Sequence, residues 1–248
     1  MKIVLMYHDL YVHDKSESGF QTVGSMPYKV KSEVFERHVK AVKEYTNSHK
    51  NTEVEFSFDD GGVTFLTLAA PILEKYGMRG TFFITTKYID TEGFLSSKQL
   101  KELAQRGHLV GAHSHTHALL NTLSHKDLID EWRISTEIIK DKIGHCDVAS
   151  IPNGASSDLV LREAQKAGIK ILYTSEPSTK EKFFNKMRLI GRYTVVDGMD
   201  ENAVMRIITD SNYRRKMYIK RLFLKTARKL MGSAYFKVRT MILKAKQK

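Results

Sequence analysis

The sequence VEFSFDDGG, at residues 54–62, alternates apolar and polar side chains and then ends in two aspartates and two glycines. Apolar residues at every second position from Val54 to Phe58 indicate a β-strand. Neighbouring residues of a strand point to opposite sides, so Asp59 and Asp60 could divide two tasks, one binding a metal and the other acting as a base. The alternative is a simple polar turn, because Asp-Gly is a common turn dipeptide.

A second stretch, HLVGAHSHTH at residues 108–117, ends an apolar run with three histidines, His113, His115 and His117. A single histidine is usually a core or surface residue. Neutral imidazole is a common zinc ligand, and two histidines with one carboxylate leave coordination positions open for water and substrate. Three histidines so close together at the end of a strand therefore favour a metal site.

Strands and helices alternate along the chain. The expected strands are short apolar runs at residues 2–8, 54–58, 79–85, within 108–117, 147–154, 169–175 and 189–195. The expected helices have apolar residues at helical spacing and begin near residues 32, 63, 97, 124, 157 and 200. Residues 9–31 are polar and turn-rich, which predicts a long surface loop.

This alternation, with no hairpin turns expected, indicates parallel strands joined by crossover helices. The carboxyl ends of such strands meet at one face, where barrels of this kind build their sites. The polar residues at these ends are His8, Asp59, Asp60, His113–His117, Pro152–Gly154, Ser175 and Arg192. Unrelated surface residues would not be expected to gather consistently at one end of the strands.

The composition places most of the positive charge in the last part of the chain. The 248 residues have a net charge of +12, and 13 of the 40 lysines and arginines lie in residues 211–248, which contain no acidic residue. Residues 1–210 are therefore close to neutral. Such a tail suggests a polyanionic partner, either an anionic membrane surface or nucleic acid.

The remaining features predict a cytoplasmic protein. The chain has no apolar run of about 18 residues that could span a membrane, and its first residues become polar too soon for a secretory signal. Cys146 is the only cysteine, which excludes an internal disulfide and fits a reducing compartment. A partly buried thiol is a better interpretation of Cys146 than a nucleophile.

Three motifs together resemble the polysaccharide deacetylase family, also called the NodB-homology or carbohydrate esterase 4 group. The [TS]FDDG motif corresponds to residues 57–61, the H-[ST]-x-x-H motif to residues 113–117, and a Pro-aromatic-Gly turn to residues 152–154. The resemblance covers about residues 1–196. It implies a distorted (β/α) barrel of seven or eight strands as a single domain, residues 1–210, followed by a basic helical tail, residues 211–248.

The resemblance also implies a catalytic site. Asp60, His113 and His117 would bind a divalent metal, usually Zn²⁺, with Co²⁺, Mn²⁺ or Ni²⁺ as alternatives. Asp59 would be the general base that takes a proton from water, and the backbone N–H of Asn153 would stabilise the oxyanion. The substrate-binding candidates are Pro152, Gly154 and Arg192. His115 would point away from the metal.

Two departures from the family pattern affect the acid–base residues. Many members carry an arginine two residues before the proline of the third motif, where this chain has Ser150. Arg192 could instead supply the positive charge near Asp59. Many members also have a late histidine that acts as the general acid. This chain has no histidine after His145, which leaves His8 as the best-placed proton donor.

The expected function is metal-dependent removal of an N-acyl group, chiefly N-acetyl, from an amino sugar in a polysaccharide or its lipid-linked precursor. The alternative is a catalytically weakened, carbohydrate-binding relative. Nucleic acid is not expected as a partner, because no base-reading motif occurs. A serine hydrolase is disfavoured, because no G-x-S-x-G elbow is present.

The tail offers two interpretations. If residues 213–231 are helical, apolar side chains fall on one side and basic side chains on the other, as in a helix that lies on an anionic membrane. The protein would then be cytoplasmic and peripheral to the membrane. The alternative is a helix packed on the barrel with a solvated basic face.

Overall fold

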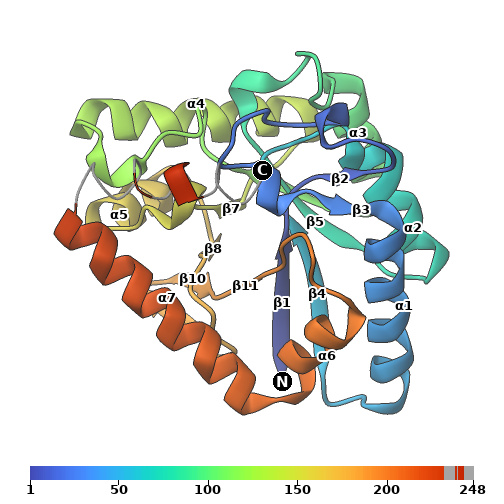
Figure 1. Cartoon of the computed structure of the whole chain (residues 1–248). Helices are drawn as coiled ribbons and strands as arrows, with labels where there is room; N and C mark the ends of the chain where they lie inside the picture. The colour runs from blue at the N-terminus through green and yellow to red at the C-terminus, as the bar shows by residue number, and fades with distance from the viewer. Residues whose placement is uncertain (232–237, 239, 243–248) are drawn as a thin grey trace.

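The computed structural model describes residues 1–231, 238 and 240–242, and nine of the strands in these residues form one curled sheet with helices on the outside (Figure 1). The sheet order is β11-β1-β4-β5-β6-β7-β8-β10-β9. Its strands are β1 (Lys2–Tyr7), β4 (Glu53–Phe58), β5 (Gly80–Ile84), β6 (Leu109–Ala112), β7 (Val148–Ser150), β8 (Ile171–Tyr173), β9 (Lys182–Phe184), β10 (Met187–Ile190) and β11 (Tyr193–Thr194). The helices are α1 (Ser32–Ser48), α2 (Ala70–Lys75), α3 (Ser97–Gln105), α4 (His125–Ile143), α5 (Asp158–Lys166), α6 (Glu201–Thr209) and α7 (Ser211–Met231).

One short segment closes the sheet into a distorted barrel. β10 pairs with β8, and β11 pairs with β1, both in parallel. Only Gly191 and Arg192 separate β10 from β11, so the same segment joins both sides of the sheet. A side chain at position 191 would place its Cβ only 2.4 Å from the carbonyl oxygen of Glu176, which explains the glycine at this bend. The barrel predicted from the sequence is therefore confirmed.

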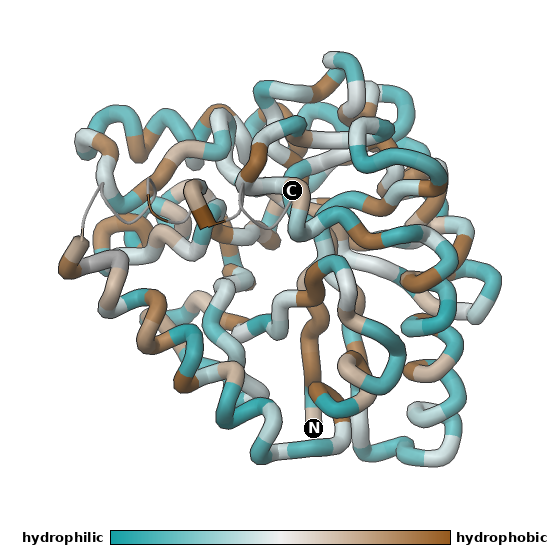
Figure 2. Tube along the Cα trace, in the orientation of Figure 1, coloured by the Kyte–Doolittle hydropathy of each residue, from teal (hydrophilic) through white to brown (hydrophobic). Residues whose placement is uncertain are grey.

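The core lies between the sheet and the helices and is rich in aromatic rings. Phe58 stacks on Phe82 of the neighbouring strand at 4.9 Å between ring centroids and on Tyr7 at 5.5 Å. Phe35 of α1 meets the same cluster edge-on. Figure 2 shows the resulting hydrophobic trace along β1 and the mixed character of the surrounding helices. These packed strands give the residues at their ends a rigid base.

Helix ends follow the capping chemistry of the sequence. The side chains of Ser96, Ser124, Ser157 and Asp200 cap α3, α4, α5 and α6. Each accepts a hydrogen bond from a backbone N–H that the helix leaves unpaired. α1 lacks such a cap, because its cap position is Lys31, which makes no capping hydrogen bond, and Ser32 is its first helical residue. The helix expected from residue 63 begins with a π-turn at Phe65–Ala69 before α2.

Two further expectations about the strands were wrong. The chain does contain a hairpin, since β9 pairs antiparallel with β10. Its turn carries Asn185 at φ 50° instead of the glycine that usually indicates such turns. The strand expected at residues 189–195 is divided between β10 and β11. The loop at residues 9–31 also contains two short paired strands, β2 (Leu10–Tyr11) and β3 (Val30–Lys31).

The tail continues the chain as α7, which includes the helix expected at residues 213–231. α7 contacts α6, from which one residue separates it, so the division of the chain at residue 210 stays a prediction. Most of residues 232–248 lie outside the described part. None of the described helices has the length and apolar character needed to cross a bilayer.

Candidate metal centre

The strand register brings the chemically interesting residues to one end of the barrel. Tyr7 of β1 lies opposite Phe58 of β4, so the residues that follow them, His8 and Asp59, leave the sheet side by side. Ala112 of β6 pairs with a residue of β7 in the same way, which places His113 beside that strand's end. This position at the carboxyl ends follows from the parallel topology.

Asp60, His113 and His117 converge on one point. Asp60 Oδ1 lies 3.1 Å from Nε2 of His117 and 3.5 Å from Nε2 of His113. One potential ligand atom of each residue lies within 4.8 Å of the others, and no other such group occurs among the described residues. Asp60 Oδ1 is buried and receives no hydrogen bond from the described residues. A buried, unpaired oxygen facing two imidazole nitrogens fits a divalent metal ion such as Zn²⁺.

The backbone is held in an uncommon conformation at the two ends of this ligand set. Asp60 has φ 91° and His117 has φ 65°, although neither is a glycine. Such conformations cost free energy and persist only where the surroundings enforce them, often at functional sites. The next residue, Gly61, also has positive φ, and a Cβ there would approach Ile84 Cγ2 to 3.2 Å. The turn therefore needs this glycine in order to aim Asp60 at the histidines.

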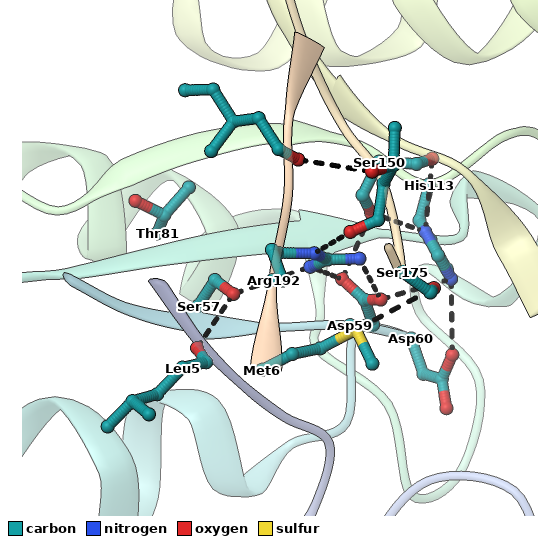
Figure 3. A network of polar contacts seen from close by, with 12 residues as sticks. Leu5, Met6, Ser57, Asp59, Asp60, Thr81, His113, Ser150, Ser175 and Arg192 are labelled. Atoms are coloured by element: carbon teal, nitrogen blue, oxygen red, sulfur yellow. Dashed lines mark hydrogen bonds and ion pairs between the residues drawn. The ribbon is translucent and has the colours of Figure 1, made fainter. Parts of the chain in front are cut away.

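Asp59 lies beside this set, with Oδ2 3.9 Å from Nε2 of His113, and forms a buried ion pair with Arg192 (Figure 3). Nη1 of Arg192 donates to Asp59 Oδ1 at 2.6 Å, and Nη2 donates to Oδ2 at 2.7 Å. Arg192 is fully buried, and its Nε donates to the carbonyl of Thr174 at 3.2 Å. A paired geometry of this kind is the strongest contact between a guanidinium and a carboxylate. The positive charge of Arg192 thus lies directly beside the carboxylate of Asp59.

Ser150 connects Asp59 to the metal-ligand candidate His113. Its hydroxyl donates to Asp59 Oδ1 at 3.0 Å and lies 2.5 Å from Nδ1 of His113. The Ser150 carbonyl oxygen also lies 3.2 Å from Nδ1. With its proton directed to Asp59, the hydroxyl can only accept from His113, so Nδ1 carries the hydrogen. Nε2 then presents its lone pair toward Asp60, which is the tautomer that a metal requires.

The charges in the site hold both carboxylates ionised. Burial alone would raise the pKa of Asp59, but Arg192 and His113 outweigh it and keep that pKa below the usual value. Burial also opposes ionisation of Asp60, and His117 with His113 holds its pKa well below the ordinary range. Conversely, burial lowers the pKa of His117, but Asp60 outweighs that effect and the pKa is raised overall. Both carboxylates are therefore ionised at neutral pH, as a metal ligand and a general base must be.

Glu131 is a site residue that the sequence did not reveal. Its carboxylate accepts backbone hydrogen bonds at 2.9 Å from His115 and Thr116, and a further one from the Thr116 hydroxyl. This contact fixes the loop that carries His117. The only indication in the sequence is an acidic residue beside Trp132 on the apolar side of α4, where a buried carboxylate needs partners.

The site opens into a cavity of about 550 Å³ whose wall includes several predicted residues. His8, Asn153 and Gly154 line it, together with the metal-ligand candidates. Burial lowers the pKa of His8, and its ring lies 4.6 Å from that of Tyr28. Asn153 has a positive φ of 56°.

Three other predicted residues lie outside the cavity wall. Pro152, the first residue of the turn at Pro152–Gly154, is buried. Arg192 was expected to bind substrate, but its guanidinium is engaged by Asp59 and does not line the cavity. His115 points away from the metal-ligand candidates, with Nδ1 3.0 Å from the hydroxyl of Thr86.

The tail helix also contributes to the cavity. Arg221, Leu224 and Lys225 of α7 form part of its wall, opposite the residues of the barrel. The sequence placed this basic side of the helix either in solvent or at a membrane. The structure places Arg221 and Lys225 of that side at the entrance to the candidate metal centre.

Comparison of the sequence with known proteins finds a matching family and several relatives. A family model described as Polysaccharide deacetylase matches residues 46–172, which is more than half of the chain. YxkH of Bacillus subtilis is 32% identical over 152 residues, which cover 60% of this chain and 54% of YxkH. The peptidoglycan-N-acetylmuramic acid deacetylase PdaA of Bacillus subtilis is 28% identical over 136 residues, covering 53% of this chain and 49% of PdaA. The matches thus span about half the length of these relatives.

Solved structures show the same fold over a larger part of the chain. The Streptococcus pyogenes deacetylase PplD, in complex with acetate, superposes with a TM-score of 0.70 at 20% identity, covering 83% of this chain and 97% of PplD. BC0361, a polysaccharide deacetylase from Bacillus cereus, gives 0.69 at 21% identity, covering 84% of this chain and 69% of that protein. At these identities the similarity supports the architecture alone.

Proposed function

Because the chain belongs to the polysaccharide deacetylase family, we propose that it hydrolyses the N-acetyl group of an amino sugar in a polysaccharide or its lipid-linked precursor. The observation that carries this proposal is the convergence of Asp60, His113 and His117 beside a second, separately held carboxylate, Asp59. Asp60 and the two histidines can hold a metal, while Asp59 stays free to take a proton from water. A binding protein needs no such division.

The residues divide the reaction as follows. A divalent ion on Asp60, His113 and His117 would supply Lewis acidity and lower the pKa of a water molecule. Asp59 accepts the proton of the attacking water, since its low pKa keeps it ionised. Arg192 fixes the orientation of Asp59 through two hydrogen bonds.

Two further residues complete the proposed reaction. The backbone N–H of Asn153 stabilises the negative oxygen that develops on the acyl carbonyl. His8 lines the cavity and passes a proton to the leaving amine; because burial lowers its pKa, its ring is neutral at rest, and the proton that it passes on is the one that Asp59 takes from the attacking water. Pro152 fixes the backbone at the start of the turn, and Gly154 contacts substrate at the cavity wall.

The direct test is acetate release from N-acetylglucosamine oligomers by the wild type and by Asp59→Asn. We expect Asp59→Asn to lose about 10²- to 10⁴-fold in kcat while it retains its metal, because it removes the base and leaves the ligands in place. Asp130→Asn, an exposed change on α4, is the matched control. Retained metal also shows that the variant is folded.

The same assay separates the enzyme from a non-catalytic, carbohydrate-binding relative. A binding protein would bind the oligomers but release no acetate, and Asp59→Asn would leave its affinity unchanged. Absence of turnover in metal-loaded wild type across N-acetylated and N-formylated sugars would contradict the proposed function.

We also propose that α7 holds the enzyme at an anionic membrane surface. The outward side of α7 exposes Ile219, Phe223 and Leu230, with exposed fractions of 55%, 72% and 82%. Basic residues such as Arg215 and Lys220 flank them, and the tail has no acidic residue. Basic amphipathic helices insert such a face between lipid headgroups, and anionic lipids on the cytoplasmic leaflet attract the charge.

Vesicle flotation tests this placement. Wild type should float with phosphatidylglycerol-containing vesicles, and Ile219→Ser combined with Phe223→Ser should lose most of that binding. Phe183→Ser is the matched control, because Phe183 is 64% exposed on β9. Equal flotation of the double variant and the wild type would contradict a membrane role for α7.

A further inference from the structure

The cavity above the metal centre has a positively charged rim that comes entirely from the tail helix. Of the described residues that line the cavity, Arg221 and Lys225 are the only lysine or arginine. They are four residues apart on α7, so their side chains leave the same face of the helix. Leu224 completes this face between them.

The barrel accommodates Arg221 in a specific way. A Cβ at Gly154 would lie 2.1 Å from Nη2 of Arg221, so the guanidinium rests where any other residue would carry its side chain. Gly154 belongs to the turn that also holds Asn153 at the cavity wall. The absence of a side chain thus brings a tail cation next to the proposed catalytic turn.

The two cations have no counterion in the described part of the protein. No ion pair joins Arg221 or Lys225 to an acidic residue there. Among the described residues of the cavity wall, the only acidic ones are Asp59 and Asp60. Arg192 already pairs with Asp59, and Asp60 faces the ligand histidines. The rim therefore keeps a positive charge that a bound anion could neutralise.

The orientation of α7 points to the same conclusion. Tyr213 and Met217 of α7 pack against the barrel core, as expected of a helix that covers it. Here Arg214 donates to the carbonyls of Ile207 and Ile208, and Arg221 faces the cavity, whereas Phe223 is 72% exposed. α7 thus turns Arg214 and Arg221 toward the barrel beside Tyr213 and Met217, whereas Arg215, Lys216 and Lys220 are exposed.

We propose that Arg221 and Lys225 form a subsite for an anionic group, a phosphate or a carboxylate, that the substrate carries next to its N-acetylated sugar. This inference rests on the proposed function for the sugar itself. A guanidinium matches phosphate and carboxylate geometry with paired donors, and lysine adds a mobile charge beside it. The preferred substrates are then sugar phosphates or acidic sugars, and neutral glycans are poorer ligands.

Calorimetric binding to Asp59→Asn, which does not consume substrate, tests the subsite independently of turnover. The probes are N-acetylglucosamine 1-phosphate, N-acetylmuramic acid and the neutral methyl glycoside of N-acetylglucosamine. Changing Arg221 and Lys225 to glutamine should weaken binding of one or both anionic probes about 10- to 100-fold, because the change removes charge-assisted hydrogen bonds, which are stronger than neutral ones. The neutral probe should change less than about twofold.

The matched control removes two charges from the outward side of the same helix, with Arg215→Gln and Lys220→Gln. It should leave all three affinities unchanged. Whichever anionic probe loses affinity in the Arg221/Lys225 variant identifies the group as phosphate or carboxylate. Adding a prenyl chain to the sugar phosphate then shows whether a lipid-linked form binds more tightly than the free one.

Two results would overturn the subsite. One is that the protein with its native Arg221 and Lys225 binds neither anionic probe more tightly than the neutral glycoside. The other is an equal loss of affinity in the rim variant and in the outward control. Failure of the proposed function is distinguishable, because an enzyme that releases no acetate from any probe could still show selective anion binding that depends on Arg221 and Lys225.

Discussion

Replacing Arg192 with glutamine is the most informative perturbation of the barrel interior. Arg192 is fully buried and holds both oxygens of Asp59 at 2.6 and 2.7 Å. Its removal leaves a buried carboxylate without its counter-charge, which typically costs about 3–5 kcal/mol of unfolding free energy. The unfolding free energy of Arg192→Lys should lie between those of the wild type and Arg192→Gln, because lysine restores the charge without the paired geometry.

The sign of the pH effect follows from the direction of the pKa shift. In the wild type the pKa of Asp59 lies below its unfolded value, so its stabilising contribution is present above the unfolded pKa and lost as pH falls through the folded one. Without Arg192, burial is less opposed and raises the pKa of Asp59. The acidic limb of the kcat/KM profile should then move toward neutral pH.

Urea unfolding at neutral pH and a pH profile of acetate release measure both effects. Arg188→Gln is the matched control, since Arg188 lies on β10 in an ion pair with Glu181 whose side chains are 40% and 39% exposed. Such a pair is worth at most about 1 kcal/mol. Equal stability losses in the two variants, or an acidic limb that does not move in Arg192→Gln, would refute this reasoning.

Three further predictions concern the metal centre and its support. Glu131→Gln should weaken zinc binding about 10- to 100-fold, as measured by competition with a chelator, because it loosens the backbone of the histidine loop. Zinc affinity should also fall as pH drops below the raised pKa of His117, because the proton favoured by Asp60 must leave before the metal binds; a pH-independent affinity would contradict this. Gly111→Ala should cost about 1–3 kcal/mol in urea unfolding, since its Cβ would lie 2.4 Å from the carbonyl oxygen of Val148; unchanged stability would show that β6 and β7 adjust freely.

The barrel and the gathering of aspartates and histidines at one of its ends were predictable because their determinants are local in sequence, whereas the choice of Asp60, His113 and His117 as ligand candidates came from the resemblance to the family motifs. Apolar periods locate strands, and the FDDG and HSHTH stretches each place their residues at a strand end. Parallel topology then brings Asp60, His113 and His117 together, even though more than fifty residues separate the first from the second. No knowledge of side-chain packing is needed for this step.

The parts that could not be predicted depend on contacts distant in sequence or on orientation. The hairpin turn at Asn185 lacks the glycine that would have indicated it. Arg192 was expected near Asp59, but the bend between β10 and β11 that brings it there was not. An amphipathic pattern showed that α7 has a basic and an apolar side, but not that Arg221, on the basic side, faces the cavity. Periodicity distinguishes the two sides of a helix without telling which of them is buried.

The measurement that tests the central claim most directly is the metal content of the purified protein by elemental analysis. Wild type should hold about one equivalent of a divalent metal after zinc is supplied, and His113→Ala should lose most of it, because the variant removes one of three ligands. His115→Ala is the control, since His115 lies in the same loop but contacts Thr86 instead of the ligand set. A metal-free wild type, or equal metal content in wild type and His113→Ala, would contradict the account.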